Sequence, residues 1–284
     1  MKKIFLAFCF VFLLSFSVYA EENRAYFPPV LMYHDIKVVA RDKFDVLLED
    51  FCEQLDWLKE NNYETLSMED FISYVKEGKN FPEKSVLITF DDGYNGIYNY
   101  VAPELKKRNM KATFFIITNM LGIFSTRYAH ITSLQLKELA DNELFSIGSH
   151  TLSHADFSKI TEDEIKKEME ASKKFLENLT GRKILAFAYP YGNYDKKIID
   201  EVKNAGYEAA FVVNDKGLCG QKARYSIPRI YMGLDLCKNN QELFKTYVQT
   251  YKDMPPEAFA ERFQPLSSDV EWYGKISSDL TRGE

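Results

Sequence analysis

Short apolar segments alternate with helical segments along most of this 284-residue chain, and this alternation is what most constrains its fold. Residues 85–90 and 112–117 are dominated by Val, Leu, Ile and Phe, as in strands that are buried on both faces. Residues 132–140 have the spacing of an amphipathic helix, and a capping box at 161–164 opens another helix through residue 179. Such alternation indicates a parallel sheet that is covered by helices and joined by right-handed crossovers.

The number of these units favours a barrel over an open sheet. Further strands are expected at 30–36, 65–67, 144–150, 184–188, 207–213 and 228–231, and further helices at 46–60, 67–75, 100–107, 195–204 and 241–251. Seven or eight strand–helix units in this length predict an α/β fold class, a (β/α) barrel with parallel strands in a single domain.

The N-terminus has the pattern of a targeting segment. Lys2 and Lys3 precede an apolar run from Ile4 to Val18, and Ala20 ends a small-residue cleavage site. We therefore expect a signal peptide at 1–20. The alternative is an uncleaved signal anchor, which would be the only part of the protein expected to contact a membrane. The barrel is expected at 21–238, followed by a C-terminal helix and tail at 239–284. The protein would then be secreted, periplasmic or at the cell surface.

Charge and cysteine content exclude two classes of function. The net charge of −6 argues against nucleic acid as a partner. Cleavage would leave Cys52, Cys219 and Cys237, an odd number without metal-binding spacing, so neither a disulfide framework nor cysteine chemistry is expected. A Cys219–Cys237 disulfide stays open, and so does the oligomeric state.

Polar side chains gather where the predicted strands end. Asp91 and Asp92 follow the strand 85–90, and three of the four histidines, His34, His150 and His154, lie at other strand ends. In a barrel the carboxyl ends of the strands converge on one face, which is where active sites form. An Asx turn capping the next helix is the alternative for the two aspartates.

The spacing of His150 and His154 favours a metal site. Four residues apart, the two imidazoles face the same way if the segment takes one helical turn. Two histidines with one aspartate leave coordination positions open, as catalytic sites do. The alternative is one histidine capping a turn and the other exposed.

Two of these motifs resemble a known family. The segments Thr89-Phe90-Asp91-Asp92-Gly93-Tyr94 and Ser149-His150-Thr151-Leu152-Ser153-His154 are similar to the first two motifs of the polysaccharide deacetylases, carbohydrate esterase family 4. The resemblance extends from about Val30 to Tyr231. It implies a distorted (β/α) barrel that removes N-acetyl groups from aminosugar polymers with the help of a divalent metal. Zinc is the expected metal, and cobalt, nickel or iron are also compatible with the ligands.

The resemblance also implies roles for individual residues. Asp92, His150 and His154 resemble the metal ligands, and Asp91 resembles the general base. Tyr191, in the turn Tyr189-Pro190-Tyr191-Gly192, would donate a backbone N–H to the oxyanion, although an ordinary rigid turn is the alternative.

Two departures from the commonest family pattern are visible. In the family an arginine usually holds the catalytic aspartate, and here Ala188 occupies its position. We expect Arg229 to take its place. The alternative is that Arg229 pairs only with a surface acid. Because no histidine follows His154, His34 is expected as the general acid. This permuted arrangement resembles the poly-β-1,6-N-acetyl-D-glucosamine deacetylases of biofilm systems.

The remaining aromatic residues are less specific. We expect Tyr94 to line the sugar cleft with Tyr191, or to be barrel filling, and His130 to be structural or surface-exposed. The function predicted is N-deacetylation of an N-acetylglucosamine polymer. An O-acetyl polysaccharide esterase and an inactive carbohydrate-binding module of the same fold are the alternatives.

Overall fold

The computed structural model describes residues 28–125, 128–213, 224–233 and 241–250. The predicted signal peptide, Cys219, Cys237 and the tail after residue 250 lie outside these described residues. Within them no helix is long and apolar enough to cross a membrane.

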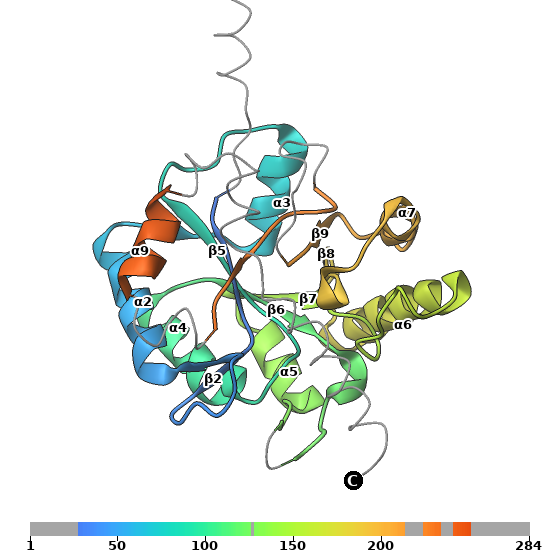
Figure 1. Ribbon diagram of the computed structural model, residues 1–284, viewed down its shortest axis with the longest axis horizontal. Coiled ribbons are helices and arrows are strands. Elements are labelled where there is room, and N and C mark those ends of the chain that lie inside the picture. The colour runs from blue at the N-terminus through green and yellow to red at the C-terminus, as the bar shows by residue number, and fades with distance from the viewer. Residues whose placement is uncertain (1–27, 126–127, 214–223, 234–240, 251–284) are drawn as a thin grey trace, which may run out of the picture.

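A curled parallel sheet forms the centre of the molecule (Figure 1). Over the described residues it contains eight strands in the order β10-β1-β5-β6-β7-β8-β9, with β4 paired to β5. The strands are β1 (Val30–Tyr33), β4 (Glu64–Thr65), β5 (Ser85–Phe90), β6 (Ala112–Ile116), β7 (Phe145–Ser149), β8 (Ala186–Ala188), β9 (Ala209–Phe211) and β10 (Ile230–Tyr231). The predicted α/β class with parallel strands is confirmed.

The segment 224–231 joins the two edges of this sheet. Ile227 forms a parallel bridge with Phe211 of β9, and its N–H donates to Ala210 at 2.9 Å. A few residues later Ile230 pairs with Leu31 of β1. The same segment therefore reaches both edge strands, which bends the sheet into a distorted barrel and brings Arg229 inside it.

Helices surround the sheet (Figure 1), and all those in the described residues except α3 pack on its outer side. They are α2 (Leu48–Glu60), α3 (Met68–Glu77), α4 (Ala102–Arg108), α5 (Ser133–Ala140), α6 (Glu162–Thr180), α7 (Lys196–Asn204) and α9 (Gln241–Thr250), with a π-helical turn η1 (Ile97–Val101) before α4 and 3-10 turns η2 (Thr118–Met120) and η3 (Pro190–Gly192). The capping box predicted for α6 is present, since Thr161 and Glu164 bond each other's backbone N–H.

Alternate residues of the strands belong to two apolar layers. Leu31, Ile88 and Phe114 pack with the outer helices. Their neighbours Val30, Leu87 and Phe115 face the other way and form a second cluster with the apolar side of α3. Because successive side chains of a strand point to opposite faces, residues on the inner face of β5 point into the barrel.

The strand predicted at 30–36 is broken at His34. After β1 the chain continues as β2 (Asp35–Lys37), which pairs with β3 (Asp45–Leu47) in a separate two-stranded sheet. Lys37 Nζ lies 2.8 Å from Asp45 and 3.2 Å from Asp35, and this buried charge cluster supports the small sheet. The prediction of one continuous strand is wrong here, because apolar composition does not reveal a change of pairing partner.

Candidate active site

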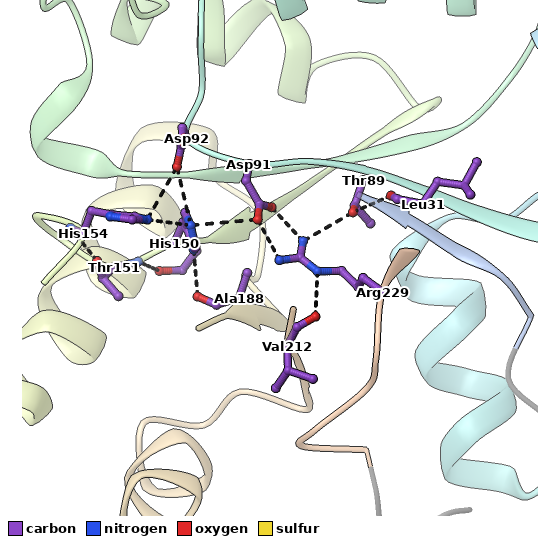
Figure 2. Close-up of polar contacts among 11 residues, drawn as sticks. Leu31, Thr89, Asp91, Asp92, His150, Thr151, His154, Ala188, Val212 and Arg229 are labelled. Atoms are coloured by element: carbon purple, nitrogen blue, oxygen red, sulfur yellow. Dashed lines mark hydrogen bonds and ion pairs between the residues drawn. The ribbon is translucent and has the colours of Figure 1, made fainter. Parts of the chain in front are cut away.

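The two aspartates at the end of β5 point in different directions (Figure 2). Asp91 continues the pairing with β1, since its N–H donates to the Tyr33 carbonyl at 2.9 Å. Asp92 has a left-handed backbone with φ 70°, and Gly93 follows at φ 79°. This reversal turns the chain away from the strand, so the Asp91 side chain faces Arg229 while the Asp92 side chain faces the histidines.

Asp92, His150 and His154 converge to form the group of side chains, within the described residues, that could hold a metal ion. Asp92 Oδ1 lies 3.5 Å from His150 Nε2 and 3.7 Å from His154 Nε2, and the two nitrogens are 3.2 Å apart. Their potential ligand atoms all lie within 4.8 Å of one another, and all three residues are buried.

The protonation of these groups fits a cation. His150 Nδ1 donates to the Ala188 carbonyl at 2.8 Å, so the lone pair of the neutral ring is on Nε2, which faces Asp92 and His154. Burial lowers the pKa of both His150 and His154, which keeps the rings neutral.

Asp92 lacks a compensating charge. Its Oδ1 has no hydrogen-bond partner among the described residues, and burial together with the charge of Asp91 raises the pKa of Asp92 to about 8. A buried carboxylate oxygen beside two imidazole lone pairs is a donor set that suits a divalent cation. The residues present therefore fit the metal that the family resemblance implies.

Asp91 forms a buried bidentate ion pair with Arg229. The two guanidinium nitrogens donate to the two carboxylate oxygens at 2.7 and 2.6 Å, and Arg229 is fully buried. Although burial raises the pKa of Asp91, the charge of Arg229 and its hydrogen bonds lower it to about 2. Asp91 is therefore ionised at neutral pH, and the alternative of a surface partner for Arg229 is wrong.

Backbone and ring contacts hold Arg229 in this orientation. Its Nε donates to the Val212 carbonyl at 3.3 Å, and its guanidinium carbon lies 5.4 Å from the centre of the Phe115 ring. The Thr89 hydroxyl, 3.4 Å from Arg229, donates to the Leu31 carbonyl at 2.7 Å. Strands β1, β5 and β6 and the residue after β9 thus jointly support an arginine that comes from the segment before β10.

His34 reaches the same site from the break between β1 and β2. Its ring lies 5.2 Å from that of Phe44 and 6.0 Å from that of Tyr231, and the residue is buried. Burial lowers its pKa to about 4, while the negative charge of Asp91 opposes the shift. Since Arg229 and His150 also act on its pKa, His34 belongs to the same electrostatic cluster.

Tyr191 and Tyr94 lie close to the candidate metal ligands. Tyr191 has a left-handed backbone with φ 60°, and its ring meets that of His154 at 4.7 Å. Tyr94 follows Asp92 by two residues, and its ring lies 4.8 Å from that of His130. His130 is buried, so the alternative of a surface position for it is wrong.

Glu168 of α6 also contacts the site, although no motif of the sequence indicates it. Its carboxylate accepts hydrogen bonds from the segment between the two histidines. Glu168 precedes the buried Met169 on α6, which indicates that it lies near the helix face that packs on the barrel. That signal is weak, because a glutamate at this position is equally typical of a solvated helix edge.

Comparison with known proteins agrees with this geometry. The family described as "Polysaccharide deacetylase" matches residues 78–210. YxkH of Bacillus subtilis, named as a polysaccharide deacetylase, is 30% identical over 224 residues, which cover 79% of this chain and 77% of YxkH. The poly-beta-1,6-N-acetyl-D-glucosamine N-deacetylase of Staphylococcus epidermidis is 32% identical over 203 residues, covering 68% of this chain and 69% of that enzyme.

A solved structure has the same fold. The Streptococcus pyogenes deacetylase PplD, in complex with acetate, superposes with a TM-score of 0.67 at 27% identity, covering 84% of this chain and 98% of PplD. The chain therefore belongs to the polysaccharide deacetylase family, whose members are hydrolases that act on amide bonds.

Proposed function

We propose that this protein is a secreted, metal-dependent deacetylase that removes acetyl groups from an N-acetylglucosamine polymer. The observation that carries the proposal is the convergence of Asp92, His150 and His154 beside an Asp91 that Arg229 holds ionised. The relatives named above support the substrate class, and the apolar segment 4–18 supports export.

Asp92, His150 and His154 would hold the divalent cation, with zinc as the first ion to test and cobalt, nickel and iron as alternatives. When bound, such a cation supplies Lewis-acid chemistry that makes water more acidic and polarises the acetamide carbonyl. Asp91 precedes Asp92 in the sequence. Its Oδ2 lies 3.9 Å from His150 Nε2, and Figure 2 shows Asp91 between His150 and Arg229. From there it would accept the proton of the attacking water.

The remaining steps use groups around Asp91. As water adds to the carbonyl carbon, the backbone N–H of Tyr191 would donate to the developing oxyanion. As the C–N bond breaks, His34 would deliver to the nitrogen the proton that Asp91 took from the water, leaving acetate and a free amine. Arg229 would keep Asp91 ionised and oriented without touching the substrate.

Acetate release from N-acetylglucosamine oligomers by the metal-loaded protein tests this proposal. Asp91→Asn should lower kcat by about 10²-fold or more, since loss of a general base typically removes that much. Full activity after Asp91→Asn, or after replacing His150 and His154 together, would refute the mechanism. Sugar binding that ignores chelator, with no acetate released, would favour an inactive binding module instead.

A parallel assay on an O-acetylated polysaccharide distinguishes the N-deacetylase from the alternative, an O-acetyl polysaccharide esterase. An ester leaving group needs less proton assistance than an amine, so His34→Ala should depress amide cleavage far more than ester cleavage. Wild-type protein that cleaves only the ester would make it an O-acetyl polysaccharide esterase.

A further inference from the structure

The segment between the two histidines has a strained backbone. Thr151 has φ 70° and His154 has φ 60°, both in the left-handed region. This region is unusual for any residue with a side chain and is a clear outlier for the β-branched Thr151. Such a conformation persists only when surrounding contacts hold it.

Two elements hold this segment from different sides. The N–H of Asn119, in η2, donates to the Leu152 carbonyl at 2.8 Å. Glu168 Oε2, from α6, accepts from the N–H of Leu152 at 2.9 Å and from that of Ser153 at 2.8 Å. Glu168 Oε1 accepts from the Ser153 hydroxyl at 2.7 Å. One carboxylate thus satisfies three donors of the short segment that joins the two candidate ligands.

These three bonds suit an ionised carboxylate best. Both of its oxygens accept, and ionised acceptors form stronger hydrogen bonds than neutral ones. Glutamine in the same place could accept from the two N–H groups only as a neutral acceptor, and at its other end it could only donate to the Ser153 hydroxyl instead of accepting from it. Aspartate would shorten the side chain by one methylene. The contact therefore favours glutamate specifically.

We propose that Glu168 is a positioning residue for the metal centre. By bonding Leu152 and Ser153 it sets His154 at the distance from His150 and Asp92 that a shared cation needs. It acts through the backbone and touches neither the metal nor the substrate. The inference rests on the proposed function, because it assumes that these three residues bind a metal.

The test compares Glu168→Gln with Glu170→Gln in the full chain. Glu170 lies in the same helix, is exposed and pairs only weakly with Lys166. Glu170→Gln is therefore a matched control that removes one negative charge from α6. The dissociation constant for Zn²⁺ is measured by competition with a chromophoric chelator, and the geometry by the visible absorption of the Co²⁺ form. Glu168→Gln should raise the dissociation constant about 10-fold or more and change the Co²⁺ spectrum, whereas Glu170→Gln should match wild type.

A general stabilising role would give a different result. Glu168→Gln would then lower the unfolding midpoint of the chelated protein and leave the Co²⁺ spectrum and the dissociation constant unchanged, which would overturn the inference. Should Glu168→Gln not fold, Ser153→Ala decides, because it removes only the hydroxyl bond. We expect a weaker affinity by about 2-fold or more there, and an unchanged affinity would overturn the inference.

Wild-type measurements separate this inference from the proposed function. If wild type binds Zn²⁺ and releases acetate while Glu168→Gln behaves identically, only the role of Glu168 is wrong. If wild type binds no Zn²⁺ in the same titration, the metal-dependent function is wrong and the inference fails with it.

Discussion

Residues with left-handed backbones gather around the candidate active site. Asp92, Thr151, His154 and Tyr191 all have φ between 60° and 70°. Each such residue costs of order 1–3 kcal/mol, which the surrounding fold has to offset. The conformation turns the Asp92 side chain away from Asp91, so that two adjacent acids reach different partners. At this scale, backbone strain separates the roles proposed for the two aspartates.

The Asp91–Arg229 pair predicts a large effect on stability. Arg229→Ala would leave Asp91 buried with an uncompensated charge, and the free energy of unfolding should fall by about 3–5 kcal/mol. Arg229→Lys should lose less, because it keeps the charge but not the bidentate geometry. Urea unfolding of the full chain measures both values.

A surface pair provides the control for this prediction. Lys197 pairs with Glu162 in full contact with solvent, so Lys197→Ala should leave the urea midpoint nearly unchanged. An Arg229→Ala midpoint as close to wild type as that of Lys197→Ala would contradict the prediction.

Buried His130 predicts a loss of stability in acid. Burial lowers its pKa to about 4, whereas the unfolded chain has the ordinary value near 6.5. Between these values the unfolded state binds a proton that the folded state does not, so stability falls as the pH decreases, by up to about 1.4 kcal/mol per pH unit.

His130→Phe keeps a ring against Tyr94 and removes this titration. In chelated protein, the free energy of unfolding of wild type should fall by roughly 2 kcal/mol more than that of the variant between pH 7 and pH 5. Parallel pH curves for the two proteins would show that His130 titrates normally in the fold.

At the scale of elements, close packing of β7 on its neighbours supports the site. A Cβ atom at Gly148 would lie 2.4 Å from Cδ1 of Phe115 on β6 and 3.3 Å from the Ala186 carbonyl on β8. The Phe115 ring in turn packs against the Arg229 guanidinium. The small residue on β7 thus allows an aromatic ring to support an ion pair that comes from other strands.

Gly148→Ala should therefore disturb more than local packing. Overpacking is expected to cost about 1–3 kcal/mol of unfolding free energy, and displacement of Phe115 should lower kcat as well. Adding Phe115→Leu makes room for the new methyl group and should recover part of the stability in urea unfolding. A Gly148→Ala protein with wild-type stability and kcat would contradict this account.

At the scale of the whole molecule, the barrel gathers groups from distant parts of the chain. Asp91 and Asp92 follow β5, His150 follows β7, and Arg229 precedes β10. Parallel strands place these ends on one face, where Arg229 and, in the proposed function, a cation balance the repulsion among buried acids. The apolar layers that hold the strands together are formed by other side chains.

Metal removal should consequently destabilise the molecule without unfolding it. Zn²⁺ at 100 times its dissociation constant should add about 2.7 kcal/mol to the free energy of unfolding, because it binds the folded state. The thermal midpoint should fall on adding chelator and recover on adding Zn²⁺. In a His154→Ala variant the thermal midpoint should change little on adding chelator or Zn²⁺. A change as large as that of wild type would show that the metal binds elsewhere.

Much of the fold follows from local patterns. Thr161 and Glu164 cap α6 where the motif placed them, and the apolar runs at 85–90 and 112–116 form the inner strands β5 and β6. These features depend on neighbours within a few residues, which a sequence displays directly. The break at His34 depends on Asp45, ten residues from Asp35, and was not visible in the periodicity.

The sequence by itself determined the parallel barrel and the strand ends from which the acids and histidines come. Strand composition and turn residues encode both. The tertiary structure alone decided between Asp91 and a surface acid as the partner of Arg229. It also decided that His150 gives its Nδ1–H to Ala188 and that Glu168 holds the segment between the histidines. These contacts join residues that are 15 or more positions apart, and their geometry exists only once the barrel has closed.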